Sequence, residues 1–194
     1  MIGLNDGNKE KLFAFFNRIA GIKPGELRCP GGLIHLHTLL EMDVYDERGV
    51  FQKHQEVRDR VIPNSFVNLL VDRMQSTSTD AQKQIWNFKY HYSGTGTDVE
   101  SATDTGLTAG TTETGYVLGS QTESTDGENY YKTVATITYT TTSTGLVISE
   151  HMLFNATSST SGIAMDRSLV SPQITVRNGW SIQFTFSASF TAGG

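Results

Sequence analysis

Residues 174–186 read ITVRNGWSIQFTF, with two short alternating runs of apolar and polar residues on either side of Asn178-Gly179. Alternation with a period of two predicts a β-strand with one buried face, and Asn-Gly is a frequent turn dipeptide. A two-residue turn at Asn178-Gly179 would put Ile174 and Val176 on the face opposite to Phe184. Burial of a single face normally fixes the register of a strand, so this turn is disfavoured.

A three-residue loop, Arg177 to Gly179, pairs residue 174 with 182 and places all the apolar side chains on one face. We therefore predict an antiparallel hairpin in which Gly179 has a positive φ angle. Ile182 and Phe184 are then expected in the core, and Gln183 and Thr185 are expected to be exposed or to face a partner.

From residue 76 onward the composition is rich in Thr, Ser, Gly and aromatic residues. Candidate strands recur at short intervals, at residues 85–92, 131–140, 146–156, 174–177 and 180–190. Regular strands separated by Gly and Ser/Thr turns predict an antiparallel sandwich or barrel. We therefore predict a mainly β fold in which residues 76–194 form a jelly-roll-like antiparallel β-sandwich.

The first part of the chain predicts a helical arm at residues 1–32 and a hairpin-plus-helix module at residues 33–75. The arm holds an amphipathic helix over about residues 8–20, which we expect to dock on protein rather than on a membrane because its polar face mixes both charges.

In the hairpin module, the alternate apolar residues between 34 and 44 share one face, and Asp46 to Gly49 supply the turn. This four-residue loop would pair His54 with Glu41. A helix over about residues 66–75 follows, with Ser65 as its N-cap.

Charge is distributed unevenly along the chain. The net charge of −5 comes entirely from residues 76–194, and residues 155–194 hold only three charged side chains, Asp166, Arg167 and Arg177. Nucleic-acid binding is disfavoured because no Lys/Arg cluster is present. A surface with so little charge is unusual for a free monomer, so we expect other chains to cover part of it.

Two stretches imitate catalytic motifs. The Gly94-Thr-Gly96 triplet lacks the third glycine of a dinucleotide loop, since Val99 stands in its place, and no P-loop Gly-Lys-Ser/Thr follows. The Asp104-Thr-Gly106 triplet resembles half of an aspartic protease, which would need a dimer to supply the second carboxylate. Its flanks, Ala102-Thr103 and Leu107, break that pattern, and we expect Asp104 to bond a turn.

Other reactive side chains give no site either. Cys29 is the single cysteine, which excludes an intrachain disulfide and a cysteine-based zinc site. His35 and His37 share one strand face, but His54 is expected about 13 Å away at 3.3 Å per residue, too far for a His₃ zinc site. Glu150 and His151 are strand neighbours that point to opposite faces and form no dyad. We predict no catalytic, cofactor or metal site.

The later part of the chain resembles structural proteins of tailed-phage particles. The likeness rests on "GTG", "ATDTGL", "ISEHMLF" and "DRSLVSPQITVRNGWSIQFTF", and "LLEMDVYDERGVFQKHQ" with "IPNSFVNLLVDRM" looks like the hairpin-then-helix module that often precedes them. It covers most of residues 33–190 and is carried by fold-defining residues. It implies a virion protein that is not an enzyme, made in the host cytoplasm.

Under this resemblance the expected role is a capsid decoration or cement protein. The expected partners are copies of itself, with a trimer favoured, and other virion proteins such as the major capsid protein or tail proteins. A tail, neck or fibre component that binds a receptor or carbohydrate is the alternative, for which the candidate residues are Trp180, Tyr90, Tyr92 and Tyr130. A dimeric aspartic-type protease is a remote third hypothesis.

Overall fold

The computed structural model describes residues 26–29, 32–75, 87–110, 116–124, 129–140, 145–157 and 162–193. These residues form a mainly β structure with antiparallel sheets and one helix, α2. The helix predicted at residues 8–20 lies outside the described residues. Part of the predicted helical arm is a strand, because residues 26–29 pair with the strand that follows them.

The larger sheet has six strands. A central pair, β2 (Gly32–Tyr45) and β10 (Ser181–Gly193), runs side by side over thirteen residue pairs. Beyond β10 come β7 (Asn129–Thr138) and β6 (Ser120–Ser124), and the other edge of β2 pairs with β1 (Glu26–Cys29) and β3 (Phe51–Arg58).

The smaller sheet has four strands in the order β5-β4-β8-β9. They are β4 (Tyr90–Gly94), β5 (Val117–Leu118), β8 (Leu146–Phe154) and β9 (Ala164–Val176). The sequence indicated β4, β7, β8, β9 and β10 with shifted ends, but it did not indicate the short strands β5 and β6.

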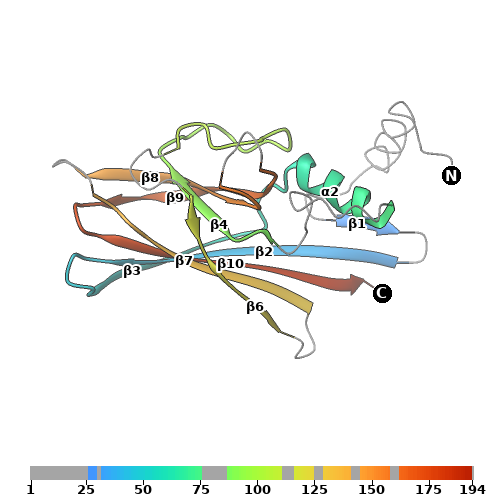
Figure 1. The fold of residues 1–194 in the computed structure, drawn as a ribbon, viewed down its shortest axis with the longest axis horizontal. Coiled ribbons are helices and arrows are strands. Elements are labelled where there is room, and N and C mark those ends of the chain that lie inside the picture. Colours follow the sequence, from blue (N-terminus) through green and yellow to red (C-terminus); the bar gives the residue numbers. More distant parts are fainter. Residues whose placement is uncertain are drawn as a thin grey trace.

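The two sheets face each other across one apolar core. Figure 1 shows β4, β8 and β9 in a layer above β2, β7 and β10. Buried residues of both sheets belong to the same cluster, which includes Met42 and Phe184 from the larger sheet and Ile148 from the smaller one. The predicted boundary at residues 75 and 76 therefore does not separate two cores, since β2 and β10 pair directly.

The predicted hairpin at residues 174–186 is wrong in its pairing. Strand β9 pairs with β8 in the smaller sheet, whereas β10 pairs with β2 and β7 in the larger sheet. The turn between them joins the two sheets, and in it Gly179 N–H donates to the Tyr139 carbonyl (2.9 Å). Alternation reports which side chains face the core, and two sheets that face each other satisfy that pattern as well as one hairpin does.

Burial along β10 follows the predicted parity with one exception. Ile182 and Phe184 are both 0% exposed and Gln183 is partly exposed, as predicted. Thr185 was expected on the surface but is only 9% exposed. It lies on a central strand between Glu41 of β2 and Val134 of β7, and these neighbours cover it.

The β2–β3 hairpin forms, with a register that differs from the prediction. Tyr45 pairs with Phe51 and Asp43 pairs with His54, so His54 does not face Glu41. The Asp46 carboxylate accepts backbone N–H groups from Arg48 and Val50, both at 2.9 Å, which holds one more residue in the turn, and a β-bulge beside Tyr45 shifts the pairing by one further residue.

Helix α2 (Asn64–Gln75) begins earlier than predicted. The carbonyl of Pro63 accepts N–H groups from Phe66 and Val67, so Ser65 lies inside the helix and is not its N-cap. Its hydroxyl donates to the Ala164 carbonyl of β9. The helix buries Phe66 and Leu69 against the core.

The Gly179→Val variant is expected to lower the free energy of unfolding by more than ~1 kcal/mol. Gly179 has a φ angle of +78°, and a Cβ atom there would lie 3.0 Å from the Cβ of Glu47. A β-branched side chain is strained in this region. Urea denaturation would measure the cost, with the exposed neighbour Asn178→Val as a matched control. Equal costs for the two variants would contradict the role of the positive φ angle.

Candidate functional site

The loop that follows β4, residues 95–110, covers the outer face of the smaller sheet around Glu150. A register irregularity in the β8–β9 pairing lies beside Glu150, which is 0% exposed. Its carboxylate accepts backbone N–H groups from Gly96 (3.0 Å), Thr108 (3.2 Å) and Ala109 (2.9 Å). One strand residue thus binds both ends of the loop.

Arg167 of β9 completes this arrangement, which we call the Arg167 network (Asp104, Thr108, Glu150 and Arg167). Its guanidinium donates from Nε (3.2 Å) and Nη2 (2.9 Å) to Glu150 Oε2, and from Nη1 to Asp104 Oδ2 (2.7 Å). Nη2 also donates to Thr108 Oγ1 at 2.7 Å. Burial lowers the pKa of Arg167, but the hydrogen bonds that its guanidinium donates to Asp104 and Glu150 outweigh this and raise the pKa above its usual value.

The glycines of the Gly-Thr-Gly triplet let the backbone approach this carboxylate. A Cβ atom on Gly94 would lie 2.6 Å from Glu150 Oε1, and one on Gly96 would lie 2.3 Å from it. Real Cβ atoms do not come so close to an oxygen. The triplet that imitates a phosphate loop is therefore a close contact between the loop backbone and Glu150.

The Asp104 triplet lies in a turn of the same loop. Asp104 N–H donates to the Ser101 carbonyl (3.0 Å), and its carboxylate accepts Ser101 N–H at 2.8 Å. In an aspartic protease the carboxylate faces a second carboxylate. Here Asp104 faces the guanidinium of Arg167.

On the opposite face of the same strands, two buried histidines meet in the core. His91 Nδ1 of β4 lies 3.0 Å from His151 Nε2 of β8, and His91 Nε2 lies 3.2 Å from Thr133 Oγ1. His151 stacks on Phe184 with ring centres 4.7 Å apart. Glu150 and His151 therefore point to opposite faces, as the alternation predicted.

Burial determines the protonation of the titratable side chains on the core-facing side of these strands. It lowers the pKa of His91 to about 3, and burial together with the neighbouring His91 holds the pKa of His151 well below its ordinary value. Burial also raises the pKa of Asp166 to about 7, and the Ser168 hydroxyl, 2.6 Å away, donates to its carboxylate. Both histidines are therefore uncharged near neutral pH, and Asp166 becomes protonated as the pH falls below about 7.

A fall in pH is expected to change the free energy of unfolding through His91 and Asp166 in opposite directions. Below pH 6.5 the unfolded chain protonates His91 and the folded chain does not, so a fall from pH 7 to pH 5 costs about 2 kcal/mol from this residue. Asp166 has a raised pKa in the folded state, so over the same range it favours the folded state as the pH falls.

The Asp166→Asn variant should therefore lose more stability than the wild type between pH 7 and pH 5. Urea denaturation of both proteins at the two pH values measures this difference, and groups common to both cancel. A smaller loss in the variant would show that Asp166 does not titrate as its burial requires.

The aromatic residues proposed for carbohydrate binding are separated. Tyr90 and Tyr92 pack with Met152, Phe154 and other residues in a second apolar cluster on the outer face of the smaller sheet. The side chain of Tyr130 lies outside the described residues. Trp180 instead lines a cleft at the end of the molecule, which we call the end cleft.

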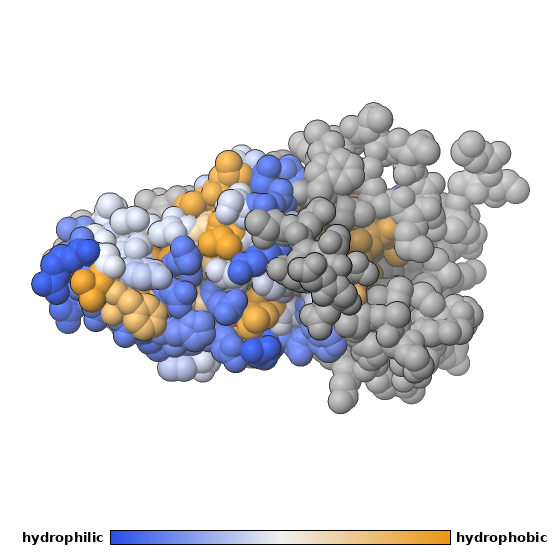
Figure 2. All heavy atoms as spheres, turned by 90° about the horizontal axis from the view of Figure 1, so that it is seen from below, coloured by the Kyte–Doolittle hydropathy of each residue, from blue (hydrophilic) through white to orange (hydrophobic). Residues whose placement is uncertain are grey.

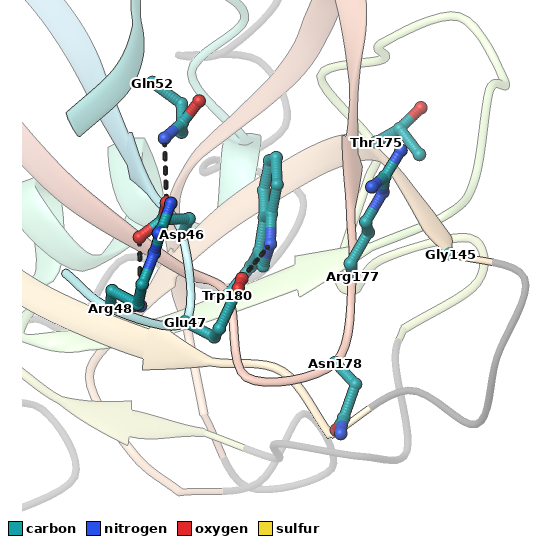
Figure 3. Close-up of a pocket in the computed structure, with 9 residues that line it drawn as sticks. All are labelled: Asp46, Glu47, Arg48, Gln52, Gly145, Thr175, Arg177, Asn178 and Trp180. Atoms are coloured by element: carbon teal, nitrogen blue, oxygen red, sulfur yellow. Dashed lines mark hydrogen bonds and ion pairs between the residues drawn. The ribbon is translucent and has the colours of Figure 1, made fainter. Parts of the chain in front are cut away.

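The end cleft has a volume of about 720 Å³ and is formed by three chain connections: the β2–β3 turn, the start of β8 and the β9–β10 turn (Figure 3). Its walls carry Trp180, two arginines, two carboxylates and several hydrogen-bonding side chains, namely Asp46, Glu47, Arg48, Gln52, Gly145, Thr175, Arg177, Asn178 and Trp180. This is a polar recess with one aromatic ring.

Two histidines on the larger sheet, His37 and His54, are bound to carboxylates. His37 Nδ1 lies 3.2 Å from Asp59 Oδ1, and His54 Nδ1 lies 2.7 Å from Asp43 Oδ1. In the described parts of the chain, no group of three or more His, Cys, Asp or Glu could hold a metal ion. The side chains of His35 and Cys29 lie outside the described residues.

Sequence reasoning missed the Arg167 network, although a signal for it exists. Glu150 is the one carboxylate of strand β8 and Arg167 is the one cation of strand β9, where its neighbour Asp166 points to the other side of the strand, and an unpaired buried charge is costly. Each such residue implies a partner of opposite charge.

In the described segments, no helix is long and apolar enough to cross a membrane.

The comparisons identify no relative. Family models, curated proteins and solved structures were compared with this chain, and none of them matches it.

Proposed function

We propose that the chain is a non-enzymatic structural subunit of a tailed-phage particle, most simply a capsid decoration or cement protein. Its body would be a jelly-roll-like β-sandwich made of the two packed sheets. The observation that carries the proposal is the loss of surface charge over the last part of the chain. Of the three charged residues in 162–193, Asp166 and Arg167 are buried, and Arg177 is exposed.

Such a surface favours association with other chains. The core of a protein interface is depleted of charged residues, because each charge must lose its water. The outward residues of β10 are Ser181, Gln183, Ser187 and Ser189, all uncharged. Figure 2 views the molecule from below, and there apolar residues form small separate patches among hydrophilic ones. Glu41 and Asp43 of β2 and Lys132 of β7 lie beside these β10 residues, so a neighbouring subunit would cover the β10 strip at little electrostatic cost and pair with the charges next to it.

The sheet edges offer a second means of contact. Strands β1, β3 and β6 lie at the edges of the larger sheet, and β5 and β9 lie at the edges of the smaller one. Edge strands carry backbone groups that can pair with another chain. Buried apolar area, at roughly 25 cal/mol per Å², would offset the cost of ordering in the assembly.

The chemistry-bearing side chains support a structural role. Asp104, Glu150 and Arg167 bind one another and the loop backbone, and the histidine pair is buried in the core. The protease alternative would require Asp104 to leave Arg167 and meet a second carboxylate. A tail, neck or fibre component remains the main alternative, with partners among the tail proteins. In each case the protein would be made in the host cytoplasm and reside in the virion.

Immunogold labelling and negative-stain microscopy of purified phage particles would test the proposal. We expect antibodies against this chain to decorate the capsid surface. Label confined to tails or fibres would favour the alternative. Label absent from particles, while the chain is abundant in the same lysate, would overturn the structural role.

A further inference from the structure

We propose that the end cleft binds an acidic saccharide, that is, a sugar carrying one carboxylate or phosphate group. Trp180 would contact the sugar ring and Arg177 would bind the anionic group. This inference stands apart from the place of the chain in a particle, because it rests on the residues that line the cleft.

The aromatic wall of the cleft is fixed in place. Trp180 Nε1 donates a hydrogen bond to Glu47 Oε2 (3.0 Å), and part of the ring packs against the core cluster. Figure 3 shows the indole between the Asp46–Arg48 turn on one side and the Arg177 side chain on the other. An indole held in this way presents an apolar surface beside a polar edge, which suits the C–H and hydroxyl groups of a sugar.

Arg177 supplies the charge. Its guanidinium carbon lies 5.8 Å from the centre of the Trp180 ring, within the ~6 Å range of a cation–π contact, so the cation and the indole lie beside each other in the cleft. The structure gives Arg177 no ion pair with a described carboxylate, whereas Arg48 is paired with Asp46 at 3.3 Å. A guanidinium without a carboxylate partner is suited to bidentate binding of a carboxylate or phosphate.

The position of Arg177 in the sequence gives independent support. Residues 162–193 expose no other charged side chain, so this surface avoids charge everywhere except at the cleft. A charge needed only for solubility would not be confined to the wall of a recess. The end cleft volume of about 720 Å³ is within the usual range for small-ligand sites, roughly 300–1,000 Å³.

The remaining lining favours a ligand with one negative charge and several hydroxyl groups. Asp46 is occupied by the backbone of its own turn and by Gln52 Nε2 (3.1 Å), but Glu47 binds Trp180 through one oxygen only. The second oxygen of Glu47 and the side chains of Asn178 and Thr175 can bind hydroxyl groups. Two carboxylates in the wall would repel a polyanion such as a nucleoside triphosphate.

Titration followed by NMR tests the proposal on the full chain. The probes are galacturonate, sialyllactose and glucose 6-phosphate, each paired with its neutral counterpart: galactose, lactose and glucose. We expect at least one acidic probe at millimolar concentration to shift the Trp180 indole N–H signal. Its neutral counterpart should bind at least about tenfold more weakly, the difference expected when one charge-assisted contact is lost.

Variants then separate the two contacts. Arg177→Gln should weaken binding of the acidic probe about tenfold and leave the neutral probe unchanged, and Trp180→Phe should weaken both. Because Trp180→Phe lacks the indole N–H, the backbone amide signals of Asn178 and Gly179 report binding in that variant. Arg58→Gln is the matched control, because Arg58 is an exposed arginine bound to Glu56 on β3, outside the cleft. No response to any acidic probe, or equal binding of a neutral counterpart, would overturn the proposal. Adenosine 5′-monophosphate is added as a nucleotide probe, and tighter binding of it than of every sugar would also overturn the proposal.

Discussion

The Arg167→Met variant is expected to lower the free energy of unfolding by about 3–5 kcal/mol, the usual cost of removing one partner of a buried ion pair. Arg167 is 1% exposed and Glu150 is 0% exposed, so the carboxylate would remain buried without its cation. The same change removes the contacts to Asp104 and Thr108. Urea denaturation monitored by circular dichroism would measure the loss.

Two comparisons make this test specific. Arg58→Met removes an exposed ion pair with Glu56 and should cost less than about 1 kcal/mol. Hydrogen exchange of residues 95–110 should speed up in Arg167→Met and stay unchanged in Arg58→Met. If both variants lose the same small amount of stability, the Arg167 network does not hold the loop.

The Phe184→Ala variant is expected to destabilise the protein by a similar amount, about 3–5 kcal/mol, because truncation of a buried phenylalanine leaves a cavity. Phe184 is 0% exposed, stacks on His151 and lies 6.5 Å from His91 between ring centres. It fills the space between the two sheets beside the histidine pair.

The adjacent Gln183→Ala variant is the control and should change the free energy of unfolding by less than about 1 kcal/mol. Gln183 points away from the core, on the opposite side of the same strand. Thermal and urea denaturation of the two variants give the comparison. If Gln183→Ala cost as much stability as Phe184→Ala, the conclusion that Phe184 faces the core and Gln183 points away from it would be contradicted.

The sequence predicted which side chains face the core better than it predicted which strands pair with each other. Alternation placed Ile174 and Phe184 in the core, and both are buried there. The two residues belong to different sheets because alternation carries no information about the neighbouring strand. The β2–β3 register depended on hydrogen bonds of Asp46 within its turn, and strand periodicity does not report them.

The candidate site was predicted least well. The Gly-Thr-Gly triplet and Asp104 imitate catalytic motifs, whereas their structural partners lie far along the chain: Glu150 is 54 residues from Gly96, and Arg167 is 63 residues from Asp104. The contact between Glu150 and Arg167 depends on the register of β8 against β9, which contains an irregularity beside Glu150. A single sequence does not define such a register, although an isolated charge in a buried strand indicates that a partner exists.

The central claim is that the chain works as a subunit of an assembly, with its weakly charged surface covered by other chains. Sedimentation velocity of the purified protein at micromolar concentrations tests this claim most directly. The account predicts a self-associated species, with a trimer favoured over a dimer. A single monomeric boundary across the whole concentration range would contradict it.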